Sequence, residues 1–113
     1  MHDILAFQKL DVYVVAREFA CLVHQSGITD TELRDQATRA AKSAFLNIAE
    51  GLPDRRQGIR HRHFSIARGS LAEAVSALDC AIMLGAVEVA RVPALRACAS
   101  RLAALLGALL RRR

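Results

Sequence analysis

The densest charge in the sequence lies in residues 55–63, which hold four arginines and two histidines. Such side chains donate hydrogen bonds to phosphate oxygens, and arginine also stacks on unpaired bases. The predicted nucleic-acid contacts are Arg55, Arg56, Arg60, His61 and Arg62. The one aromatic residue beside them, Phe64, belongs to a core stripe, so the segment predicts electrostatic contact rather than a base-stacking platform. A solvated turn that only keeps the protein soluble is the alternative.

Two rows of polar side chains flank this basic segment, each with members three or four positions apart and therefore on one face of a helix. The first row is Gln36, Arg39, Ser43, Asn47 and Glu50, and the second is Ser65, Gly69, Glu73 and Ser76. They are either two solvated faces or a hydrogen-bonded seam, within one subunit or between subunits. In the seam, Arg39 would pair with Glu50 or Glu73, and Gly69 would allow close approach.

Three further arginines, Arg111, Arg112 and Arg113, close the sequence. Cations at this position complement the negative end of a final helix, and a frayed, solvated tail is the simplest interpretation. A second phosphate contact is the alternative.

Residue patterns typical of enzymes and metal sites are missing from the sequence. A di-iron bundle needs Glu-x-x-His on two helices, and no glutamate here is followed three positions later by histidine. His61 and His63 are two positions apart, so on a helix they point in different directions and cannot share a metal. There is no glycine-rich phosphate loop and no Gly-x-Ser-x-Gly motif. We therefore expect no catalytic residues, no metal and no cofactor.

Size and composition favour one helical domain over residues 1–113. Hydrophobic residues make up 53% of the chain, but there are only four Phe, one Tyr and no Trp, which predicts a closely packed aliphatic core of helix on helix. The net charge is +5, and most of the basic residues are arginine, which permits a polyanionic partner without requiring one. Cys21, Cys80 and Cys98 are odd in number and form no Cys-x-x-Cys pair, so we expect reduced core thiols, a cytoplasmic location and no membrane partner.

Hydrophobic periodicity predicts four helices joined by short connections, hence an all-α, antiparallel up-down four-helix bundle. In the first helix, Leu10 and Val14 widen the apolar stripe. Thr29-x-x-Glu32 is a capping-box pattern for the second, and Pro93 suits the first turn of the fourth. The second carries an alanine-rich stripe, and Gly85 is the expected C-terminal cap of the third. The expected ranges are 7–25, a second helix from 29 or 30 to 51, 59–84 and one that begins near 93.

Two motifs at this separation, Asn-Ile-Ala-Glu-Gly at 47–51 and Ala-Arg-Gly-Ser at 67–70, resemble those of the bacterial 23S rRNA intervening-sequence proteins. The resemblance covers nearly the whole chain. It implies an up-down bundle that assembles into a homopentamer with a basic surface for nucleic acid. A related branch, the accessory variability proteins of diversity-generating retroelements, partners a reverse transcriptase. The matching positions, which we assign to a structural polar seam, are Arg39, Asn47, Glu50, Gly69, Ser70 and Glu73.

Two functional hypotheses follow. The first is a non-enzymatic, homo-oligomeric bundle that binds RNA or DNA through the basic turn between the second and third helices, with several copies raising the avidity of a weak contact. The second is a protein-interaction module, such as an accessory subunit of a nucleic-acid-processing enzyme, in which the basic turn serves mainly solubility.

Overall fold

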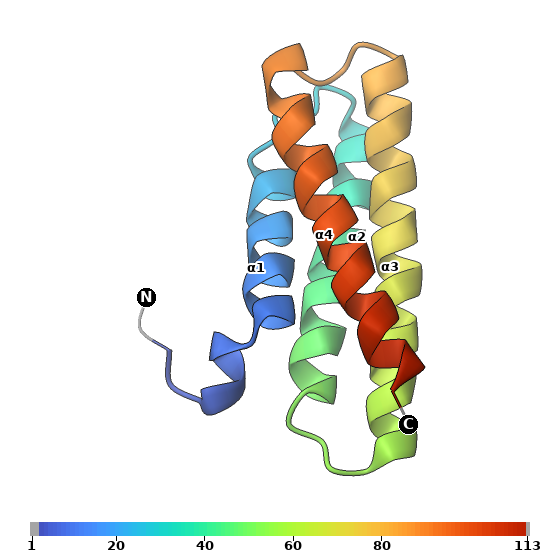
Figure 1. Cartoon of the computed structure of the whole chain (residues 1–113). Coiled ribbons are helices and arrows are strands. Elements are labelled where there is room, and N and C mark those ends of the chain that lie inside the picture. The colour runs from blue at the N-terminus through green and yellow to red at the C-terminus, as the bar shows by residue number, and fades with distance from the viewer. Residues whose placement is uncertain (1–2, 113) are drawn as a thin grey trace.

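Four α-helices run alternately up and down in the computed structural model, which describes residues 3–112 (Figure 1). The helices are α1 (Asp11–His24), α2 (Thr31–Gly51), α3 (Gln57–Met83) and α4 (Val92–Arg111), with short 3-10 helices η1 (Ala6–Lys9) and η2 (Val89–Arg91). Helices consecutive along the chain pack together, and α4 closes the bundle against α1. The described residues contain no strand. The predicted all-α four-helix bundle is confirmed.

The first helix begins four residues later than the sequence predicts. Residues from Ala6 to Lys9 form η1, and Leu10 is extended, with φ −69° and ψ 141°, which separates η1 from α1. The side-chain amide oxygen of Gln8 accepts 2.7 Å hydrogen bonds from the backbone N–H groups of Ile4 and Leu5. These two bonds satisfy backbone N–H groups just before η1 and give the chain an alternative to one continuous helix.

The start of α2 is capped by Asp30 rather than by Thr29. The Asp30 carboxylate accepts a 3.0 Å hydrogen bond from the Leu33 N–H. Thr29 instead donates its backbone N–H, at 3.0 Å, to the carbonyl oxygen of Ala86 in the connection between α3 and α4. The capping-box prediction was therefore wrong by one residue, because Thr29 is used to join the two loops at this end of the bundle.

The predicted stop of α3 and start of α4 are confirmed. Gly85 has φ +71°, and the Ala86 and Gly85 N–H groups donate to the carbonyls of Ala81 and Ile82, which is the Schellman arrangement. Pro93 lies in the first turn of α4, where its missing N–H leaves no helical bond unmade.

The closest packing in the bundle joins α2 and α3. Small residues dominate both facing surfaces, so the two backbones approach closely. The buried residues of α2 are Ala37, Ala40, Ala41, Ala44, Ile48 and Gly51, and those of α3 are Phe64, Ala67, Ser70, Leu71, Ala74, Ala77, Leu78 and Ala81. The alanine-rich stripe predicted for α2 lies at this contact.

Some residues expected in the core lie at the surface. Val12, Val15 and Phe19 of α1 are buried, but Leu10 is 47% exposed and Val14 is 37% exposed. Of the three cysteines, only Cys98 is buried, and Cys21 is exposed. The apolar stripe of α1 is therefore wider than the surface that the bundle covers.

One face of α4 packs on the bundle, and the other exposes alanines. Its buried residues are Leu95, Cys98, Leu102 and Leu106, while Ala97 and Ala104 are exposed.

The segment Val89–Arg111 is long and apolar enough to cross a membrane by length and composition alone, with 22% of its most apolar window buried. Arg96 and Arg101 interrupt that segment, and an arginine at a bilayer centre costs about 3 kcal/mol on insertion scales.

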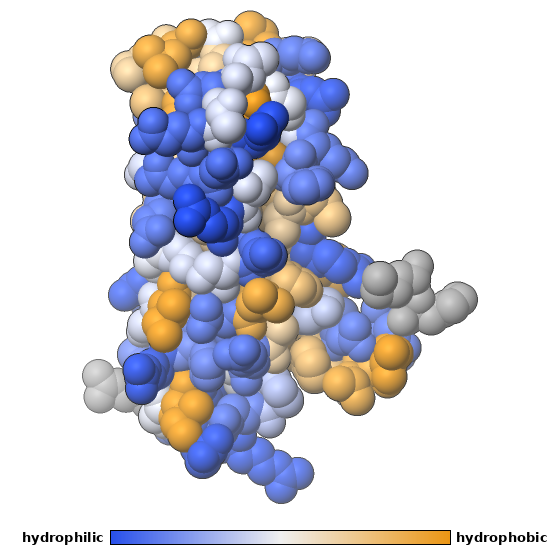
Figure 2. All heavy atoms as spheres, turned by 180° about the vertical axis from the view of Figure 1, so that it is seen from behind, coloured by the Kyte–Doolittle hydropathy of each residue, from blue (hydrophilic) through white to orange (hydrophobic). Residues whose placement is uncertain are grey.

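The bundle face turned away from α4 is mostly hydrophilic, with separate hydrophobic side chains between the charged ones (Figure 2). Among the large apolar side chains exposed on α2 and α3 are Leu46, Ile66 and Val75. Scattered surface residues of this kind are ordinary in a single chain.

Candidate nucleic-acid interface

The predicted basic segment spans the turn between α2 and α3 and the first two turns of α3. The last turn of α4 lies beside it, at the same end of the bundle (Figure 1). Residues 55–62 and residues 111–112, which are far apart in the sequence, therefore contribute to one basic end. Arg113, the third arginine of the C-terminal run, lies outside the described residues.

Arg56 is held by an acidic residue of the same turn. Its guanidinium donates two hydrogen bonds to the Asp54 carboxylate, Nε to Oδ1 at 3.1 Å and Nη2 to Oδ2 at 2.9 Å, and its backbone N–H donates to Oδ1 at 2.9 Å. These bonds lower the pKa of Asp54 to about 2 and raise that of Arg56. The charge of this predicted contact residue is thus balanced within the turn.

Arg60 joins the end of α2 to the start of α3. Its Nη1 donates a 2.6 Å hydrogen bond to the carbonyl oxygen of Leu52, which is the C-cap of α2. The guanidinium carbon lies 5.2 Å from the centre of the Phe64 ring, in cation–π range. Arg60 is therefore partly a structural residue, although one hydrogen bond leaves most of its five N–H donors available.

Four exposed arginines remain without an acidic partner at this end. Within residues 3–112, Arg55, Arg62, Arg111 and Arg112 make no ion pair, and all four are exposed. His61 is also exposed. Besides these four, Arg60 can reach a partner through its remaining N–H donors, and His61 offers its ring nitrogens at the surface.

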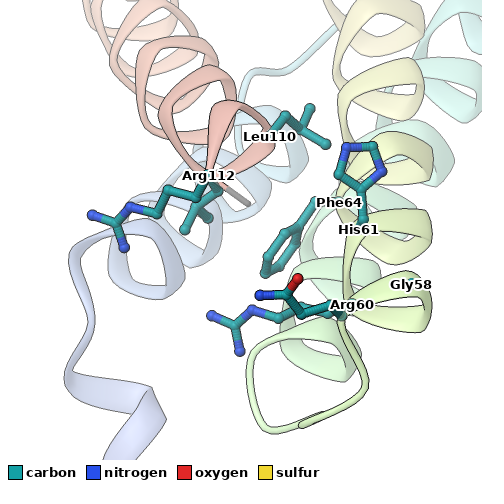
Figure 3. A pocket seen from close by; sticks show the side chains of 8 residues that line it. Gly58, Arg60, His61, Phe64, Leu110 and Arg112 are labelled. Carbon is teal, nitrogen blue, oxygen red and sulfur yellow. The ribbon is translucent and has the colours of Figure 1, made fainter.

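A pocket of about 450 Å³ opens between these two cationic segments (Figure 3). Leu109, Leu110 and Phe64 supply its apolar lining, while Arg60, His61 and Arg112 supply polar groups. No sequence pattern signals this pocket, because it needs the C-terminal turn of α4 to lie against the start of α3.

Three members of the first polar row, Ser43, Asn47 and Glu50, lie in a polar seam inside the subunit, and their partners on α3 are Ser70 and His63 rather than members of the second row. The hydroxyls of Ser43 and Ser70 share a 2.9 Å hydrogen bond, and Asn47 Nδ2 donates to the Ser43 carbonyl oxygen at 2.9 Å. Asn47 Oδ1 accepts from His63 Nδ1 at 3.0 Å, and the same nitrogen lies 3.4 Å from a carboxylate oxygen of Glu50. His63, which points away from His61, is a member of the seam that the polar-row pattern missed.

The outer part of the seam opens into a groove on the α2–α3 face. Arg39 and Glu73 both line it, but the structure places no ion pair between them, and the Arg39 Nε donates to the Asp35 carbonyl oxygen at 3.5 Å. Glu50 lies near His63 rather than Arg39. Gly69 is exposed, and an added Cβ there would meet no atom within 4 Å. The expected pairing of Arg39 and the expected close approach at Gly69 are therefore absent from this subunit.

The packing of α3 against the end of α2 explains why a glycine occupies position 51, the last residue of the Asn-Ile-Ala-Glu-Gly motif, and the sequence alone did not show this. A Cβ at this position would lie 2.8 Å from Cε1 of Phe64 and 3.1 Å from Cβ of His63. Glycine therefore lets α3 begin directly against the end of α2, which brings Arg60 and Phe64 to the pocket.

The chemistry available at the basic end is anion binding. It offers guanidinium groups, a histidine and an apolar surface, and Asp54, which the turn already uses, is the acidic residue that pairs there. Across residues 3–112, no group of three His, Cys, Asp or Glu side chains is placed to hold a metal ion.

Comparison with known families gives one match. The family model described as 23S rRNA-intervening sequence protein matches residues 8–108. No curated protein matches the chain. The matched range spans all four helices and both motif segments.

Proposed function

Because the chain belongs to the 23S rRNA-intervening sequence protein family, we propose that it is a non-enzymatic RNA-binding protein of the cytoplasm and that its basic end is the contact surface. Phosphate contacts supply most of the affinity of such surfaces and make binding strongly dependent on salt. The chain carries a net charge of +5, which favours association with a polyanion.

One observation carries this proposal. Two segments separated by about half the chain meet at one end of the bundle, and together they present four exposed arginines without an acidic partner among the described residues, namely Arg55, Arg62, Arg111 and Arg112. Elsewhere in residues 3–112, arginines without an ion pair, such as Arg34, Arg68 and Arg101, lie on three different helices rather than together at one end. The basic end therefore has the charge density that a phosphate backbone attracts.

We further propose that the protein acts as a homo-oligomer, five-fold as the family resemblance implies. The exposed alanine face of α4 and the open space around Gly69 support this part, because both would let a helix of another subunit approach closely. Repeating the basic end in each subunit would convert weak single contacts into strong overall binding through avidity.

The test is RNA binding by the nuclease-treated protein across a salt series. Four phosphate contacts to single-stranded RNA predict a slope of about −3 in a plot of the logarithm of the association constant against the logarithm of the salt concentration. The variant Arg55→Glu with Arg62→Glu should bind at least about tenfold more weakly. A matched control, Arg34→Glu with Arg101→Glu, makes the same charge change at exposed positions on other parts of α2 and α4.

The two variants separate a local surface from a general charge effect. The control should lose little affinity, because charges beyond about 10 Å are largely screened at moderate salt. A slope near zero, or equal losses in the two variants, would overturn the proposed contact surface. The mass of each variant in solution is measured first, so that loss of assembly is not mistaken for loss of binding.

A second candidate function is a protein-interaction module, such as an accessory subunit of a nucleic-acid-processing enzyme like a reverse transcriptase. The exposed apolar side chains of Leu10 and Val14, four positions apart at the start of α1, favour it, since they leave apolar surface that a partner could cover. A stoichiometric partner protein that copurifies after nuclease treatment would favour this function over RNA binding.

A further inference from the structure

The pocket at the basic end combines two kinds of surface. The side chains of Leu109 and Leu110 are half-buried and form an apolar wall, while Arg60, His61 and Arg112 bring polar groups to its edges (Figure 3). Its volume of about 450 Å³ lies in the range of small-molecule sites. A ligand that fits both surfaces has a flat apolar part and an attached anion.

We propose that this pocket receives one unpaired nucleotide of a single-stranded nucleic acid, with its base against the apolar wall and its phosphate against the cations at the edge. The proposal rests on the proposed function and adds to it which form of nucleic acid the surface prefers.

Arg60 is held in position for this role before any ligand binds. Its bond to the Leu52 carbonyl and its contact with the Phe64 ring fix the plane of the guanidinium. The remaining N–H groups can donate to a phosphate, and the exposed part of a fixed guanidinium plane can stack on a base. Phe64 is only 2% exposed, so a base would contact the leucines and the guanidinium rather than the face of that ring.

A base-paired strand cannot use the pocket in this way. Bases in a duplex are stacked inside the helix, so only phosphates and sugars reach a protein end surface, and the apolar wall would stay uncovered. The four free arginines contact either form through phosphates. The pocket therefore adds affinity for an unpaired segment, whereas the arginines do not discriminate.

The experiment compares a single-stranded RNA with a blunt-ended RNA duplex of the same length by fluorescence anisotropy. The variant Leu110→Asn changes the apolar wall without changing charge, and Leu84→Asn, at an exposed leucine at the opposite end of α3, is its control. A contact with one base is worth about 5-fold to 100-fold in affinity. We expect Leu110→Asn to lose at least about 5-fold for the single strand, with duplex binding and the affinity of the control variant unchanged.

A second measurement covers the case in which Leu110→Asn fails to fold. Wild-type protein is crosslinked by light to RNA that contains 4-thiouridine, and the attached peptides are identified by mass spectrometry. Adducts on residues 57–64 or 109–112 support the pocket, and adducts confined to other parts of the surface overturn it. If free AMP fills the pocket and displaces the RNA completely at the same concentrations, the pocket is a site for free nucleotides rather than for a nucleotide of a strand.

Failure of this inference is distinguishable from failure of the proposed function. If the wild type binds neither RNA form at low salt, the proposed function fails. If both forms bind equally, and Arg55→Glu with Arg62→Glu weakens both, the basic end stands and the nucleotide pocket is refuted.

Discussion

Replacing Gly51 by alanine should destabilise the fold, although alanine is the better helix former. The added Cβ would lie 2.8 Å from Cε1 of Phe64, where ordinary contact begins at about 3.4 Å, so the ring must move by about 0.6 Å. Phe64 is 2% exposed and Ile48 and Leu52 beside the site are buried, so the ring has little room. Overpacking of this kind costs about 1–3 kcal/mol, against a helix-propensity gain of at most about 1 kcal/mol.

From the middle of the overpacking range, the net loss of unfolding free energy is about 1 kcal/mol, which lowers Tm by about 4 °C for a chain of this size. Gly69→Ala is the matched control, because it is the same change in the adjacent helix at an exposed site with open space. In the monomer, where no atom lies near this site, it should raise stability by about 0.5–1 kcal/mol. Thermal unfolding followed by circular dichroism, at several protein concentrations, measures both changes.

The two substitutions must therefore shift stability in opposite directions. A Gly51→Ala protein as stable as the wild type would refute the argument from close approach. A Gly69→Ala protein that is destabilised only where the wild type is oligomeric would place Gly69 at a subunit contact, and destabilisation of the monomer would contradict the open environment described above.

Three further outcomes are expected. Asp54→Asn frees Arg56 and should make the log–log slope of RNA affinity against salt steeper by about 0.7. Asp79→Asn makes the same charge change near the other end of α3 and should leave the slope unchanged, so equal effects of the two variants would contradict a local contact. Ser43→Ala and Ser70→Ala should each lower the free energy of unfolding by about 1 kcal/mol, and the double variant should lose less than the sum because the two hydroxyls share one hydrogen bond. Additive losses in denaturant titrations would show that this bond contributes nothing. Burial, with a smaller contribution from a nearby glutamate, raises the pKa of Cys98 from 9.0 to about 11, so iodoacetamide should alkylate this thiol slowly in the folded protein. The contribution of Cys98 to the free energy of unfolding should be complete below pH 9 and fall between pH 9 and about 11, because the thiol of the unfolded chain ionises first. Alkylation of the native thiol as fast as in urea would refute its burial.

The helices could be predicted from the sequence because their signals are local. The alanine stripe of α2, the glycine stop at Gly85 and Pro93 in the first turn of α4 act through backbone geometry and side-chain size within a few residues. The ends at Leu10 and Thr29 could not be placed in the same way, because Gln8 bonds to η1 and Thr29 bonds to a loop 57 residues away. Competing contacts of this kind are decided only when the chain has folded.

The candidate site divides in the same manner. Arginine density in residues 55–62, the basic C-terminus and the polar rows are properties of the sequence. The conformation of the α2–α3 turn decides that Arg56 pairs with Asp54 and that Arg60 bonds to the Leu52 carbonyl. The packing of α4 beside α3 decides that Arg112 and His61 line one pocket. The sequence determined the charge and the helices, and the tertiary structure alone decided which charges remain free and what they surround, because ion pairs and pockets form between residues that only folding brings together.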